Sequence, residues 1–88
     1  MNFKKHFREQ DIPEAIKELN CIEDLMKLVL LNIHSGGLER AETRLYDVLR
    51  SVERLMHLNK AKRNEDMILA HRELLEEFFN EQNQTLHS

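Results

Sequence analysis

The sequence predicts an all-α protein: a three-helix protomer, made of a helical hairpin plus a third helix, that assembles into a dimeric helical bundle. Apolar residues recur at steps of three and four along most of the chain. The composition includes two glycines, one proline and 33% charged residues, which favours helices over a strand-rich fold. A chain of 88 residues forms one small domain that would be marginally stable alone, so self-association is the predicted stabiliser.

The first ten residues are distinct from the predicted helical domain, which covers 11–80. Phe3 and Phe7 lie four residues apart among basic side chains, a spacing that suits an amphipathic turn docking on a partner or a membrane surface. Chain termini are usually poorly tied down. The sequence therefore predicts a mobile segment over 1–10.

The first long helix is predicted over 12–34. Asp11 and Glu14 have the spacing of a capping box, and Pro13 lies in the first turn, where its missing N–H costs nothing. Ser35 and the two glycines after it end the helix, since glycine adopts the left-handed conformation without a Cβ penalty.

A second helix is predicted over 38–58 and a third over 65–80. The apolar signal lapses over 59–64, which favours a turn, although no glycine or proline occurs there. One continuous helix over 38–80 therefore remains an alternative. The polar residues of 81–88 predict a frayed C-terminal tail.

The most apolar stretch of the chain runs from Leu25 to Ile33. It contains Lys27 and is too short to cross a membrane, which takes about 20 apolar residues. Its apolar side chains cover nearly the whole helix circumference, and a helix that is apolar all round is buried all round. A lone protomer would leave a patch exposed, although a well-packed monomer remains an alternative. The residues predicted to form the interface with a second copy or another partner are Leu25, Leu28, Leu30, Leu31 and Ile33.

Charge is divided unevenly along the second half of the chain. Residues 40–63 include seven Lys or Arg and three Asp or Glu, whereas 64–88 include six acidic residues and one basic residue. Such segments are suited to antiparallel pairing, within one chain or between protomers. The residues predicted to face a charged partner are Arg40, Arg44, Arg50, Arg54, Lys60, Lys62 and Arg63.

Patterns that carry catalytic or cofactor chemistry are missing from the sequence. The five histidines form neither Glu-x-x-His nor His-Glu-x-x-His, and Ser35 with its two glycines lacks phosphate-loop spacing. Cys21 has no neighbouring histidine to activate it. The sequence predicts no enzyme, catalytic residue, metal or cofactor. A single cysteine and no apolar signal segment predict a cytoplasmic location.

The basic face also suits nucleic acid, because Lys and Arg can contact phosphates with salt-dependent affinity. Against this, the chain has a net charge of −3, Asp47 interrupts the face, and no zinc-finger or RNA-recognition signature is present. The sequence therefore predicts a small non-enzymatic regulatory or adaptor protein that works by protein–protein interaction, as a homodimer. A DNA-binding transcriptional regulator is the alternative.

Overall fold

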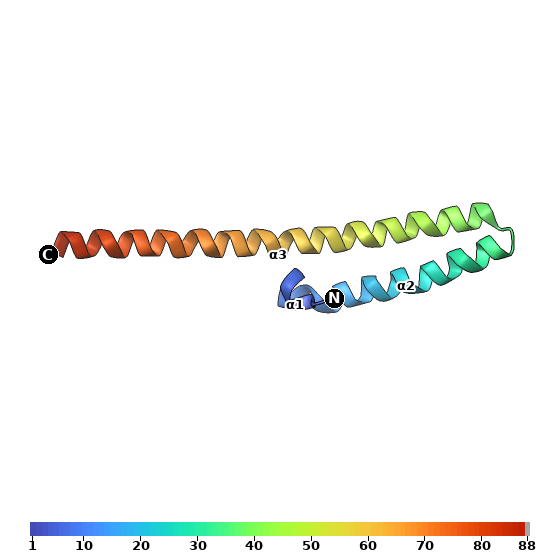
Figure 1. Cartoon of the computed structure of the whole chain (residues 1–88), viewed down its shortest axis with the longest axis horizontal. Helices are drawn as coiled ribbons and strands as arrows, with labels where there is room; N and C mark the ends of the chain where they lie inside the picture. Colours follow the sequence, from blue (N-terminus) through green and yellow to red (C-terminus); the bar gives the residue numbers. More distant parts are fainter. Residues whose placement is uncertain (88) are drawn as a thin grey trace.

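The computed structural model describes the backbone of residues 1–87 and the side chains of residues 1–81. It is all-helical, with 91% helix and no strand in the described part of the chain. Figure 1 shows two long helices joined by a tight turn, one of them extending far beyond the other, within principal dimensions of 79 × 18 × 15 Å. The elements in chain order are α1 (Phe3–His6), the short 3₁₀ helix η1 (Glu9–Asp11), α2 (Ile12–His34) and α3 (Leu38–His87).

Helix α2 spans the range that the sequence predicts for the first long helix. Its end is fixed by Gly36, which has a φ of 81°, and by a 2.7 Å hydrogen bond from the Gly37 amide to the Asn32 carbonyl. The capping-box prediction at its start is wrong, since the Asp11 side chain makes no cap hydrogen bond. Asp11 instead accepts a 2.7 Å hydrogen bond from Arg8 Nε, which raises the pKa of the Arg8 guanidinium above its ordinary value.

Helix α3 is continuous where the sequence favours a turn over 59–64, so the alternative of one long helix is correct. The stretch contains neither glycine nor proline, and an ion pair of 2.9 Å between Lys62 and Asp66 spans one helical turn across it. The predicted third helix, 65–80, is therefore the C-terminal part of α3. The predicted tail, 81–88, lies outside the described side chains except at Glu81.

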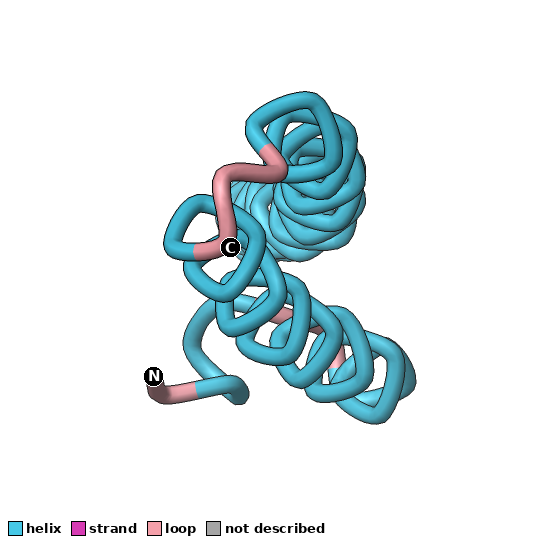
Figure 2. Tube along the Cα trace, turned by 90° about the vertical axis from the view of Figure 1, so that its right-hand side faces the viewer, coloured by secondary structure: helices cyan, strands magenta, loops and turns pink. Residues whose placement is uncertain are grey.

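Helix α2 and the first half of α3 form an antiparallel hairpin, which Figure 2 shows from its turn as a single layer of two helices. Small side chains line the contact, and Ala15, Ala41 and Ser51 are all buried. Small residues allow two helix backbones to approach closely. The apolar core lies at the open end of the hairpin, where Phe7, Ala15 and Leu58 form one buried cluster.

The N-terminal segment is folded against this open end, although the sequence predicts that it is mobile. The Phe7 side chain is 3% exposed, and the ring centroid of Phe3 lies 6.2 Å from that of Phe7. Asn59 Nδ2 of α3 donates a 2.8 Å hydrogen bond to the His6 carbonyl. Burial of a whole phenylalanine contributes about 1.5–3 kcal/mol toward holding this segment in place.

Candidate interaction surface

The two sides of the hairpin layer differ in chemistry, and the polar side is identified by an ion pair between the helices. Arg54 of α3 donates hydrogen bonds of 2.8 and 2.6 Å from Nε and a terminal guanidinium nitrogen to Glu14 Oε1 of α2. A depression beside this pair is lined by Glu18, Cys21, Leu25, Asp47, Arg50, Ser51 and Arg54. This side is therefore suited to solvent or charged groups.

The opposite side of the hairpin is apolar. Its position follows from helix geometry. Ala15, Val29 and Ser51 are buried and face the other helix of the hairpin. The residue that follows each of them along the chain points about 100° further round the helix, on the side away from the ion pair. Every large side chain on this side is exposed by a third or more of its area, with Leu49 at 52%. We define the apolar face of the hairpin as Ile16, Met26, Leu30, Ile33, Leu45, Leu49, Val52 and Met56.

The structure separates the five residues predicted as an interface. Leu30 and Ile33 lie on the apolar face. Leu25 lines the depression on the polar side, and Leu28 is one residue before buried Val29, turned toward that same side. Leu31 points away from α3 and is 64% exposed. The sequence predicts that the apolar stretch from Leu25 to Ile33 is buried on all sides. Within one chain this is not the case, because Val29 is the one residue of this stretch that is buried.

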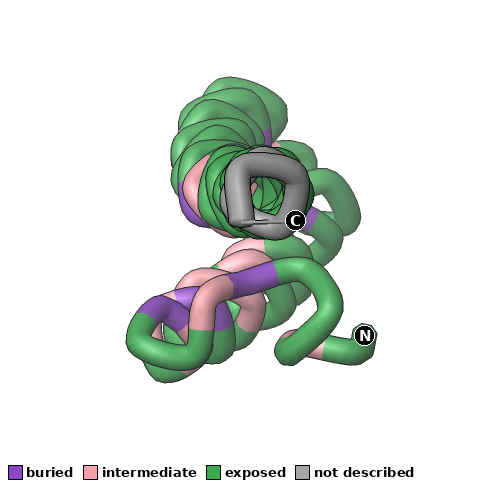
Figure 3. The backbone as a smooth tube through the Cα atoms, turned by 90° about the vertical axis from the view of Figure 1, so that its left-hand side faces the viewer, coloured by how far each residue is buried: buried purple, intermediate pink, exposed green. Residues whose placement is uncertain are grey.

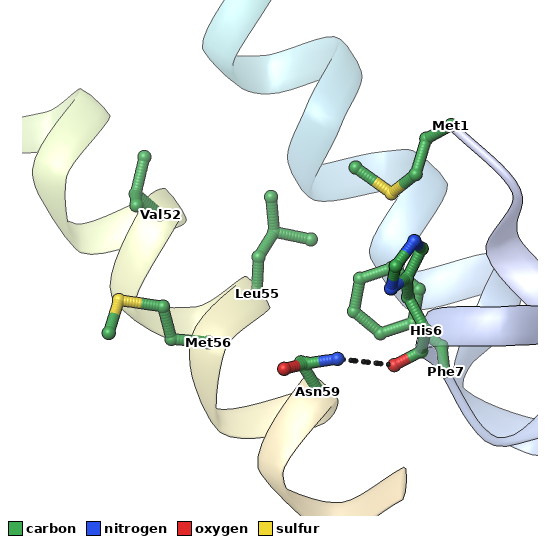
Figure 4. A pocket seen from close by; sticks show the side chains of 7 residues that line it. All are labelled: Met1, His6, Phe7, Val52, Leu55, Met56 and Asn59. Atoms are coloured by element: carbon green, nitrogen blue, oxygen red, sulfur yellow. Dashed lines mark hydrogen bonds between the residues drawn. The ribbon is translucent and has the colours of Figure 1, made fainter. Parts of the chain in front are cut away.

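An apolar pocket of about 310 Å³ opens where the N-terminal segment meets the apolar face. Figure 4 shows its lining residues, with Val52, Leu55 and Met56 of α3 on one side and Met1, His6 and Phe7 on the other. The hydrogen bond from Asn59 to the His6 carbonyl closes one edge. Sequence reasoning missed this pocket because it treated the first ten residues as mobile, and the four-residue spacing of Phe3 and Phe7 was the available signal.

Beyond the hairpin, α3 continues as an arm, which we define as residues 64–81. Every described side chain of the arm is exposed, and Figure 3, which views α3 from its C-terminal side, draws most of the described part of this helix in green, the colour of exposed residues. Seven of them are large and apolar, including the adjacent rings of Phe78 and Phe79, whose centroids lie 5.9 Å apart. The apolar residues of the arm are Met67, Ile68, Leu69, Leu74, Leu75, Phe78 and Phe79. A soluble helix rarely exposes so much apolar surface without a binding role.

The predicted charged face is partly occupied by the chain's own carboxylates. Arg50 pairs with Asp47, Arg54 with Glu14, and Lys62 with Asp66. The other predicted residues of this face, Arg40, Arg44, Lys60 and Arg63, are exposed. The face therefore offers fewer free cations than the sequence suggests.

Features that would indicate chemistry are sparse in the described residues. Cys21 is an exposed free thiol on the polar side of α2. No group of three or more His, Cys, Asp or Glu residues in this part of the chain is arranged to hold a metal ion. Among the described helices, none combines the length and apolar content required to cross a membrane.

Comparison of the chain with protein-family models, with curated proteins and with solved structures finds no match.

Proposed function

We propose that this chain is a small non-enzymatic regulatory or adaptor protein that acts by protein–protein interaction, and that it works as a homodimer. The observation that carries the proposal is the apolar face of the hairpin, on which eight large side chains lie on one side of a two-helix layer. Contiguous apolar surfaces of this kind mark interaction sites on soluble proteins.

The small size of the core supports self-association. The buried apolar residues in the described part of the chain are Phe7, Ala15, Val29, Ala41 and Leu58. The part of the chain that packs on itself covers residues 1–62, and below roughly 70–80 residues one core rarely supplies more than about 3–5 kcal/mol, so that association with another chain commonly adds stability. Covering the apolar face would add buried surface where the hairpin lacks it.

Light scattering after gel filtration tests this proposal directly. At micromolar concentration we expect twice the mass of one 10.5 kDa chain. Leu49→Glu places a charge on the apolar face and should weaken association by about tenfold or more, because an unpaired charge is costly to bury. Leu31→Glu is the matched control, since Leu31 is equally apolar but points away from α3, and it should leave the mass unchanged.

Two results would contradict the proposal. A monomeric mass for the unmodified chain would remove the homodimer. If Leu31→Glu dissociates the dimer and Leu49→Glu does not, the interface lies on the outer surface of α2 and the apolar face is not the binding surface.

The alternative function is binding of duplex DNA through the exposed cations Arg40, Arg44, Lys60 and Arg63. Their exposure favours this function, whereas the carboxylate partners of Arg50 and Arg54 disfavour it. Binding to DNA phosphates should fall steeply between low and moderate salt and weaken in Arg40→Glu, Arg44→Glu. An absence of duplex binding at low salt would eliminate this alternative.

A further inference from the structure

The arm repeats the spacing of the α3 part of the apolar face, with one polar residue, His71, among its four positions. On the hairpin, Leu45, Leu49, Val52 and Met56 follow one another at steps of four, three and four residues. On the arm the same steps separate four further residues, namely Met67, His71, Leu74 and Phe78. Steps of four and three keep side chains on one side of a helix, and are the spacing of helix-pairing positions.

We propose that the arm of each chain docks on the apolar face of a second copy, so that two chains pair antiparallel along α3. This inference rests on the proposed homodimer and specifies its geometry. The two-fold axis of the dimer repeats every contact between the chains once in each half of the dimer. The contacting pairs, one residue from each chain, are Leu45 with Phe78, Leu49 with Leu74, Val52 with His71, and Met56 with Met67.

The register is selected by the chain itself. If α3 of one chain is shifted by seven residues along α3 of the other in one direction, Glu42 lies opposite Leu74. A shift of seven residues in the other direction places Arg63 opposite Met67. Either shift buries a charge against an apolar side chain, which is unfavourable. The stated register is therefore preferred over its neighbours one heptad away.

Charge selects the antiparallel orientation. Residues 40–63 carry seven basic and three acidic side chains, a net charge of +4, whereas 64–88 carry one basic and six acidic, a net charge of −5. Antiparallel pairing places the positive part of each chain beside the negative part of the other, except at the two-fold axis, where Lys60 of one chain faces Arg63 of the other. Parallel pairing would place like charges together, which is disfavoured in association.

The shape of α3 makes both surfaces available to one partner. The helix is continuous and the arm extends beyond the start of α2, as Figure 1 shows. Met56 and Met67 are eleven residues apart, about three turns of a straight helix, so the two patterns lie on nearly the same side. The pocket beside Val52 and Met56 is open in the single chain (Figure 4), at the position where His71 and Met67 of the second copy would enter.

Disulfide trapping tests the register. Cys21→Ser first removes the exposed native thiol. Leu49→Cys and Leu74→Cys are then made in separate chains, which are mixed, allowed to exchange and oxidised. We expect a covalent dimer in the mixture and none from either variant alone. In the proposed pairing, copies of the same position lie about 37 Å apart at 1.5 Å per residue, whereas a disulfide needs Cα atoms about 5.5–6 Å apart.

A matched control replaces Leu74→Cys by Leu69→Cys, which lies on the same arm outside the four contacting pairs and should not cross-link to Leu49→Cys. Light scattering of each variant before oxidation keeps the two proposals distinguishable. A dimeric mass with no covalent product in the mixture overturns the docking of the arm but leaves the homodimer intact. Cross-linking of Leu49→Cys to itself also overturns it, in favour of parallel helices or face-to-face hairpins. A monomeric mass overturns both proposals.

Discussion

The hairpin and the arm share one helix but differ in what stabilises them. Up to Lys62, α3 packs against α2 and the N-terminal segment, and it buries Ala41, Ser51 and Leu58. From residue 63 to 81 every side chain is exposed. Most of the stability of helices in proteins comes from tertiary packing, which the hairpin part of α3 has and the arm lacks within the chain. The comparison shows that one continuous helix can have one half packed against its own chain and another half whose described side chains are all exposed.

The largest effect is expected from opening a cavity in the hairpin core. Leu58 is 4% exposed and packs with Phe7 and Ala15, so Leu58→Ala should lower the free energy of unfolding by about 2–5 kcal/mol. Leu69→Ala makes the same change on the arm, outside the four proposed contacting pairs, and should cost less than about 1 kcal/mol. Urea unfolding at one fixed protein concentration measures both. If the two variants lose the same free energy of unfolding, the hairpin part of α3 is not stabilised by burial more than the arm is.

A helix-breaking substitution in the arm should separate the two halves. Proline inside a helix costs about 3 kcal/mol relative to alanine, so Ala70→Pro should interrupt the arm while leaving the hairpin folded. The expected result is a partial loss of the helical circular dichroism signal, together with conversion of the dimer to a monomer. Complete unfolding would show instead that the hairpin depends on the arm within the same chain.

The parts of the hairpin and the arm that could be predicted from the sequence are those determined by residues close together in the chain. The bounds of α2 follow from Pro13 and from the glycines after Ser35, which act on the adjacent backbone. The lapse of apolar residues over 59–64 predicts a turn, but α3 is continuous there and passes the start of α2. Helix continuity there depends on the absence of a breaking residue, a weaker signal than the loss of periodicity.

The candidate site was less predictable, because it depends on contacts between distant residues. The sequence predicts Leu30 and Ile33 as interface residues, and both lie on the apolar face. The division of the apolar run between two sides of the hairpin depends on the rotation of α2 against α3, which periodicity alone does not specify. Burial of Phe7 required knowing that the chain returns to the level of Leu58, 51 residues later.

A smaller effect is expected at the junction of hairpin and arm, where a substitution should strengthen the dimer instead of weakening it. In the proposed pairing Lys60 of one chain faces Arg63 of the other, and the two-fold axis repeats this contact. Replacing both residues by alanine removes two like-charge contacts, worth together about 1 kcal/mol, and should tighten the dimer by roughly fivefold. Sedimentation measures the dissociation constant, and added salt should reduce the gain. Arg40→Ala, far from the axis, is the control and should weaken the dimer slightly. Weaker association of the double variant would contradict the antiparallel register.

The smallest effect is expected on the polar side of the hairpin, at the ion pair of Arg54 with Glu14. Both side chains are two-fifths or more exposed, at 44% and 40%, so water and salt screen the attraction despite its 2.6 Å distance. A double-mutant cycle with Arg54→Ala and Glu14→Ala should give a coupling energy of about 0.2–1 kcal/mol. A coupling of the size expected for Leu58→Ala would mean that charge, and not burial, holds α2 against α3. The hairpin would then weaken in high salt as strongly as the proposed dimer, and the contrast between a core held by burial and an arm oriented by charge would be lost.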